Sequence, residues 1–155
     1  GADGPYPMLA RALLVSGNRK RAADVLSTMV SLGDVPFEVH VSLADLVLQT
    51  GDTAGAANAL ESAMFMNPYE IPQHERLATL YASLGDTKRA VRERPAVVAL
   101  NPVDKAEAGY QLALAHRAAG SARDARHSVL RALEDAPHFE RAQELLLQLH
   151  EGRNP

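Results

Sequence analysis

The sequence predicts an all-α protein: a right-handed α-solenoid, in which antiparallel helix pairs stack along the chain. Three observations lead to this prediction. Glycines recur at steps of 34, 34 and 35 residues, namely Gly17, Gly51, Gly85 and Gly120. Prolines follow the same steps of 34 and 35 residues, namely Pro68, Pro102 and Pro137. Between these markers, apolar residues recur every three to four positions, which is the period of a helix with one buried face.

Two further markers fall in the same register. Eight residues before each glycine lies a leucine, and five residues after it lies an alanine: Leu9, Leu43, Leu77 and Leu112, then Ala22, Ala56, Ala90 and Ala125. In the first unit, Asp34 stands where the later units have proline. The whole chain is therefore expected to form one array of four repeats, numbered one to four below, at about residues 3–36, 37–70, 71–105 and 106–139.

Each repeat is expected to contain two helices separated at the glycine. A helix commonly ends on a residue in the left-handed conformation, which glycine adopts at least cost. The residue that follows each glycine can then cap the next helix, and these N-caps are Asn18, Asp52, Asp86 and Ser121. The small register alanines allow the two helices of a repeat to pack closely. The expected helices span residues 6–16, 19–31, 36–50, 53–66, 71–84, 87–100, 104–119 and 122–135.

A ninth helix is expected near residues 139–150, with Leu145, Leu146 and Leu149 on one face. A helical array exposes the apolar face of its last repeat, so a terminal helix with a polar outer face is needed to cover it. Before the seventh helix, Asp104 and Glu107 have the spacing of a reciprocal capping box.

Pro95 lies inside the sixth expected helix. Proline has no amide to donate to the carbonyl of Val91, and its ring clashes with that turn, at a cost of about 3 kcal/mol. The sequence therefore predicts a kink or break between Arg92 and Pro95.

A helix–turn–helix of 34 residues with leucine, glycine, alanine and proline at these offsets resembles the tetratricopeptide repeat family. Repeat three is the nearest to the family pattern, with His74-Glu-Arg-Leu77-Ala78-Thr-Leu-Tyr81, then Gly85-Asp86, Ala90 and Asn101-Pro102. The resemblance covers about residues 5–150. The chain departs from the pattern at the aromatic position near the start of each repeat, which holds Tyr6, His40, His74 and Gly109.

The resemblance implies that the first helix of each repeat lines a groove that receives a peptide or a partner helix. Transferred to this register, the groove residues are Arg11, Val15, Val41, Asp45, Gln49, Glu75, Thr79, Tyr110, Leu114 and Arg117. Tyr110 is the best single anchor, because an aromatic ring with a hydroxyl contributes both apolar area and a hydrogen bond.

Some members of this family clamp a C-terminal carboxylate of chaperones with lysine, asparagine and arginine side chains. Here the first two clamp positions hold Pro7 and Arg11, and Pro72 replaces the lysine of repeat three. Only Arg76 matches, so the clamp subtype is not supported.

Composition and motifs argue against several other functions. The formal net charge is −3, and the basic run Arg19-Lys20-Arg21 has no aromatic neighbours for base stacking, so nucleic acid is not expected as a partner. The sequence has no cysteine and no pair of histidines at metal-binding spacing, so no metal and no cofactor is expected. No serine lies in a nucleophile elbow, and the six histidines are interpreted as packing or surface residues. No enzyme activity is expected of this chain.

Three hypotheses of function stay open. The first is a non-enzymatic scaffold that binds a protein or peptide in the groove, with micromolar affinity. The second is a module that self-associates. The third is an accessory domain of a larger bacterial enzyme, because the chain begins Gly-Ala-Asp-Gly without methionine and is rich in alanine, arginine and leucine. A soluble protein of the cytoplasm or periplasm is expected, since no apolar run approaches the length of a membrane span.

Overall fold

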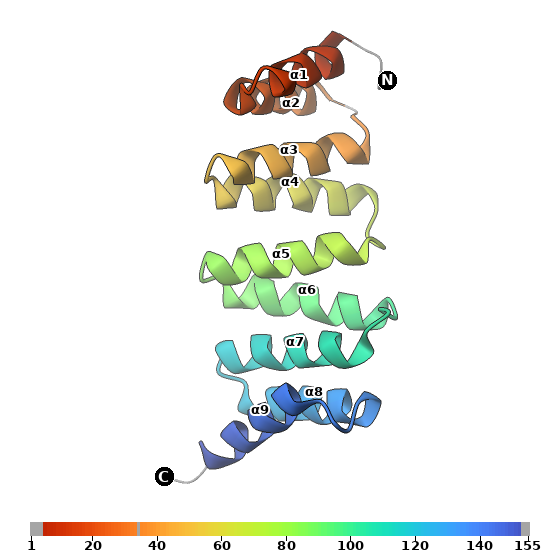
Figure 1. The fold of residues 1–155 in the computed structure, drawn as a ribbon, viewed down its shortest axis with the longest axis vertical. Helices are drawn as coiled ribbons and strands as arrows, with labels where there is room; N and C mark the ends of the chain where they lie inside the picture. Colours follow the sequence, from red (N-terminus) through yellow and green to blue (C-terminus); the bar gives the residue numbers. More distant parts are fainter. Residues whose placement is uncertain (1–4, 34, 153–155) are drawn as a thin grey trace. The chain divides into compact units, whose positions relative to one another are not determined.

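The computed structural model describes residues 5–33 and 35–152. These residues form nine helices and no strand, as the sequence predicts (Figure 1). Every helix begins and ends within one residue of its expected position. The helices are α1 (Pro5–Val15), α2 (Arg19–Leu32), α3 (Phe37–Gln49), α4 (Thr53–Met66), α5 (Ile71–Ser83), α6 (Thr87–Ala99), α7 (Lys105–Ala118), α8 (Ala122–Asp135) and α9 (Glu140–Glu151). Within the described residues, none of these helices has the length and apolar character of a bilayer-crossing segment.

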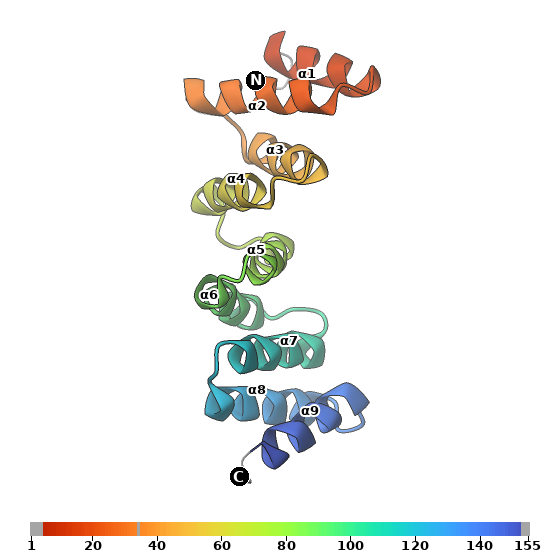
Figure 2. The same cartoon turned by 90° about the vertical axis from the view of Figure 1, so that its left-hand side faces the viewer.

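The chain divides into two compact units, residues 1–70 and 71–155, and the division falls at the expected boundary between repeats two and three. In the first unit α1 packs against α2, α2 against α3, and α3 against α4. In the second unit the same order continues from α5 to α9. Figure 1 shows α3 and α4, and likewise α5 and α6, running antiparallel within their own unit, and Figure 2 shows these helices nearly end-on.

The core of each unit is built from alanine and leucine at the register positions. Ala22, Ala56, Ala90 and Ala125 are all buried, as expected for residues that let two helices approach closely. The register leucines differ: Leu43 and Leu77 are buried, whereas Leu9 is 48% exposed. Leu9 lies on α1, the first helix of the described residues.

The turns between helices have the expected chemistry, with one exception. Gly51 and Gly85 have φ angles of 89° and 74°, the left-handed region that only glycine enters without strain. The caps at Asn18, Asp52 and Asp86 accept hydrogen bonds from the amides of Arg21, Gly55 and Arg89, at 3.3, 2.7 and 3.0 Å. The exception is Ser121, which stands at the cap position of α8 but makes no side-chain capping bond.

The capping box before α7 forms only in one direction. The Asp104 carboxylate accepts from the Glu107 amide at 2.8 Å. Among the described residues no bond returns from the Glu107 carboxylate to the Asp104 amide. That carboxylate instead accepts hydrogen bonds from Gln111 and Arg141.

The prediction of a break at Pro95 is wrong. Helix α6 continues from Thr87 to Ala99 with Pro95 inside it. Pro95 lies on the exposed face of the helix, where water can solvate the carbonyl that its missing amide would have bonded. Packing of Ala90 and Val97 on the opposite, buried side holds the helix together across the proline.

Helix α9 has the apolar face that the sequence predicts. Leu145 and Leu149 are buried, and Leu146 packs beside them against a cluster that includes Val129 of α8. Its other face carries the exposed residues Gln143, Glu144 and Gln148. The helix therefore covers the apolar end of the second unit and presents polar groups outward.

Candidate functional site

The expected groove residues are divided between the two units, and each unit places its own. In the first unit, Arg11 lies on α1 and Asp45 and Gln49 lie on α3, all three exposed. Of the remaining two positions there, Val15 is exposed and Val41 is half-buried.

In the second unit, Glu75 and Thr79 are exposed on α5, and Arg117 is exposed on α7. Tyr110 and Leu114 are half-buried on α7, where both pack against the apolar cluster that α7, α8 and α9 share. This unit therefore brings part of the expected set together with α9. The candidate site is built from it.

Tyr110 is the centre of an organised group of side chains. Its ring lies 5.2 Å from the ring of Phe139, centroid to centroid, at an interplanar angle of 58°. The guanidinium of Arg141 lies 5.1 Å from the Tyr110 centroid and 5.0 Å from the Phe139 centroid, within the range of cation–π attraction. We call Glu107, Tyr110, Phe139 and Arg141 the Tyr110 cluster.

Glu107 fixes the position of the arginine in this cluster. Arg141 Nη2 donates to Glu107 Oε2 at 2.7 Å, and Gln111 Nε2 donates to the other oxygen, Oε1, at 2.8 Å. An arginine held by a carboxylate on one side keeps its remaining donors for a ligand.

Arg94 of α6 extends the charges toward α5. Burial lowers the pKa of Arg94, and the carboxylates of Glu75 and Glu107 oppose that shift. The guanidinium therefore interacts electrostatically with two carboxylates, one from α5 and one from α7. Charges of alternating sign thus run from Glu75 through Arg94 and Glu107 to Arg141.

The C-terminal end of α7 is also linked to α9, because Arg117 Nη1 donates to Gln148 Oε1 at 2.7 Å.

Beside the Tyr110 cluster lies a shallow pocket of about 440 Å³. Its walls are formed by three members of the cluster, Glu107, Phe139 and Arg141, and by the turn before α9. The arrangement offers an aromatic surface, a positioned cation and acidic groups.

Tyr110 is among the groove residues expected from the sequence, whereas Phe139 and Arg141 are not. One signal could have found the arginine: Arg141 follows Glu107 by 34 residues, which is one repeat. Equivalent positions of neighbouring repeats lie side by side in a stacked array, so opposite charges at this spacing predict an ion pair.

The histidines of repeats two and three are both buried, and they differ in their partners. His74 Nδ1 lies 2.8 Å from Glu93 Oε2, and the two residues are only 9% and 6% exposed. The other carboxylate oxygen, Glu93 Oε1, accepts from Arg92 Nε at 2.9 Å. His40 occupies the same place in repeat two, but its Nδ1 is buried without a hydrogen-bond partner, and burial lowers its pKa.

The buried pair of repeat three was not predicted from the sequence. Its signal was the spacing of Ala90, Glu93 and Val97, which puts a carboxylate on the buried face of α6. Within the part of the chain that the structure describes, no three histidine, aspartate or glutamate side chains gather closely enough to hold a metal ion.

No protein-family model and no curated protein matches the sequence. Solved structures do match the fold. The crystal structure of MamA superposes with a TM-score of 0.72 at 17% identity, covering 93% of this chain and 84% of MamA. YrrB, described as a TPR protein with an unusual peptide-binding site, gives 0.66 at 17% identity, covering 90% of this chain and 71% of YrrB.

A third structure is the first TPR of Spaghetti (RPAP3) bound to an HSP90 peptide. It gives a TM-score of 0.62 at 21% identity, covering 75% of this chain and 91% of that one. These are helical-repeat proteins, and the similarity extends over most of the chain in each case. The chain has the fold of the tetratricopeptide-repeat proteins.

Proposed function

We propose that this chain is a non-enzymatic interaction scaffold that binds a peptide on the face formed by α5, α7 and α9. The observation that carries the proposal is the Tyr110 cluster. A half-buried tyrosine, a second ring and an arginine held by a carboxylate already contact one another without a ligand. Preorganisation of this kind reduces the entropy lost on binding.

The charges of the site favour a peptide of mixed character. Glu75 and Glu107 attract a basic side chain, Arg141 attracts a carboxylate or a backbone carbonyl, and the two rings accept an apolar side chain. Two proteins of similar fold support the peptide class, because YrrB is described by its peptide-binding site and the RPAP3 repeat domain was solved with a bound peptide. The expected groove residues Glu75, Thr79, Leu114 and Arg117 belong to this proposal. Arg11, Asp45 and Gln49 stay a separate proposal for the first unit.

The test is a selection of peptides from a random library on the immobilised full chain, with a counter-selection on the Arg141→Gln variant. We expect peptides that the wild type retains and the variant releases. Arg123→Gln is the matched control, because Arg123 is an exposed arginine of α8 outside the cluster. Peptides that all three proteins retain equally would contradict the proposal.

Self-association is a second candidate function, favoured by one observation in the first unit. At the end of α4 and in the turn after it, Phe65 is 93% exposed, Met66 46% and Tyr69 75%. Large apolar side chains gathered at one turn are typical of a contact surface. Light scattering tests this: mass should rise with concentration in the wild type and stay monomeric in Phe65→Ser. A wild type that stays monomeric at high concentration excludes this candidate.

A further inference from the structure

Two equivalent interior positions hold large polar side chains in repeat three and small residues in repeat four. In repeat three they hold the buried pair of His74 and Glu93, 2.8 Å apart. The equivalent residues one repeat later, 35 positions along the chain, are Gly109 and Ser128. An imidazole ring and a carboxylate are thus replaced by a hydrogen atom and a hydroxymethyl group.

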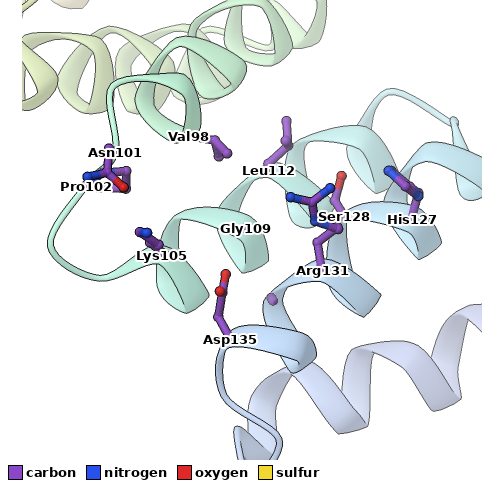
Figure 3. A pocket seen from close by; sticks show the side chains of 11 residues that line it. Val98, Asn101, Pro102, Lys105, Gly109, Leu112, His127, Ser128, Arg131 and Asp135 are labelled. Atoms are coloured by element: carbon purple, nitrogen blue, oxygen red, sulfur yellow. The ribbon is translucent and has the colours of Figure 1, made fainter.

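A cavity of about 400 Å³ lies at this place, and both Gly109 and Ser128 line it (Figure 3). It opens between the C-terminal end of α6 and the helices α7 and α8, with Val98 and Leu112 as its apolar walls. Close approach of α7 and α8 has closed only part of the space. A Cβ on Gly109 would lie 3.2 Å from Ala132 Cβ, and the rest of the volume stays open. Its size falls within the range of sites that hold a side chain or a small ligand.

The polar groups of the cavity suit a negatively charged ligand. Ser128 is 6% exposed and contributes a hydroxyl to the lining of the cavity. Arg131, Lys105 and His127 lie around the opening, against one carboxylate, Asp135. Arg131 is held only loosely, by Glu134 at 3.6 Å, and both of those side chains are largely exposed. The guanidinium is therefore available to a ligand.

In repeat three the equivalent position stabilises a buried carboxylate. There the Glu93 carboxylate is bonded by His74 and by Arg92. The residue equivalent to Arg92 in repeat four is His127, which lines the cavity. Repeat four therefore keeps a basic side chain at the position that holds a carboxylate in repeat three, and lacks the carboxylate.

We propose that this cavity is a second binding site, which receives a glutamate or aspartate side chain of an acidic peptide. The ligand carboxylate accepts a hydrogen bond from the Ser128 hydroxyl and pairs with Arg131. An apolar residue next to it in the peptide packs on Val98 and Leu112. The site shares no residue with the Tyr110 cluster, so it goes beyond the function proposed above, and either can fail without the other.

The test is an amide chemical-shift titration of the full chain with a short amidated peptide that has one glutamate between two leucines. The same peptide with glutamine is the reference ligand. We expect saturable shifts at Gly109, Ser128 and Arg131 with the glutamate peptide at millimolar concentration, and about tenfold weaker binding of the glutamine peptide, as for loss of one charge-assisted hydrogen bond. Absence of shifts at these residues, or equal binding of the two peptides, overturns the proposal.

Four variants make the assignment specific. Arg131→Gln should weaken binding about tenfold, whereas Arg123→Gln, on the same helix and with the same change in charge, should leave it unchanged. Ser128→Glu places the carboxylate of repeat three in the cavity and should abolish the shifts; if that variant does not fold, Arg131→Gln decides. Tyr110→Ala should leave the titration unchanged. Equal weakening by Arg123→Gln and Arg131→Gln would overturn the site, since it would show attraction by overall charge alone.

Discussion

The interior polar pair of the repeats shows how single residues set stability and function in this chain. In repeat three a histidine and a glutamate satisfy each other in a buried place. In repeat two Ala59 replaces the glutamate, and His40 Nδ1 is left without a partner. In repeat four neither large side chain is present, and a cavity lies there. A buried polar group is costly only when it is unsatisfied, so the same position can stabilise one repeat and destabilise another.

Glu93→Ala tests the contribution of the buried pair. The substitution leaves His74 in the state that His40 already has, a buried imidazole without its carboxylate partner. We expect a loss of about 1–3 kcal/mol in the free energy of unfolding, measured by urea titration. The double variant His74→Leu/Glu93→Leu should lose less, because it leaves no unsatisfied group. A single variant as stable as the wild type would show that the pair is not formed.

His40 predicts a specific response to acid. Burial lowers its pKa from the usual value of 6.5, so the folded chain resists the proton that the unfolded chain accepts. Stability is therefore fully present above about pH 6.5 and falls as the pH drops through and below that value. Thermal unfolding at neutral and at mildly acidic pH should show a smaller acid loss for His40→Phe than for the wild type. An identical loss in both would contradict this assignment.

At the scale of the helix, the ends are set by local chemistry that repeats along the chain. A left-handed glycine ends one helix, and an asparagine or aspartate begins the next in three of the four repeats. Because these signals depend on residues within one turn, the sequence was sufficient to predict all helix bounds within one residue. Ser121 shows the limit: the residue type fits a cap, but its hydroxyl does not make the bond.

The caps give a matched pair of variants. Asp52 accepts from the Gly55 amide at 2.7 Å, so Asp52→Ala should reduce the free energy of unfolding by about 1 kcal/mol. Ser121→Ala should change it by a few tenths of a kcal/mol at most, because no capping bond is lost. Denaturant midpoints of the two variants measure the difference. Equal losses would mean that Ser121 caps α8 in solution.

Pro95 provides the second prediction at this scale. The missing amide and the ring clash of Pro95 follow from the sequence alone. The face of α6 that the proline occupies, and the packing of Val97 and Ala90 that anchors the helix, do not. Since α6 continues through the proline, Pro95→Ala should restore one hydrogen bond and stabilise the chain by about 1–3 kcal/mol. A rise in the melting temperature checks this; a fall would show that the proline is needed for packing.

At the scale of the whole chain, the sequence predicted the fold more completely than the site. The helix pair recurs in four repeats, so each marker residue can be compared with the equivalent residues of the three other repeats. The Tyr110 cluster forms once, between the last repeat and α9, and it depends on the side chains of Phe139 and Arg141 meeting Tyr110 across different helices. Contacts of that kind follow from packing and not from residue spacing, apart from the 34-residue separation of Glu107 and Arg141.

Peptide binding by the Tyr110 cluster can be measured by calorimetric titration of the full chain with one library-selected peptide. Tyr110→Ala should weaken binding by at least about tenfold, as expected for an aromatic anchor residue. Tyr69→Ala is the matched control, because Tyr69 is a 75% exposed tyrosine of the first unit, and it should bind like the wild type. Circular dichroism confirms that both variants fold. A peptide that binds Tyr110→Ala as tightly as the wild type would show that the Tyr110 cluster is not its binding site.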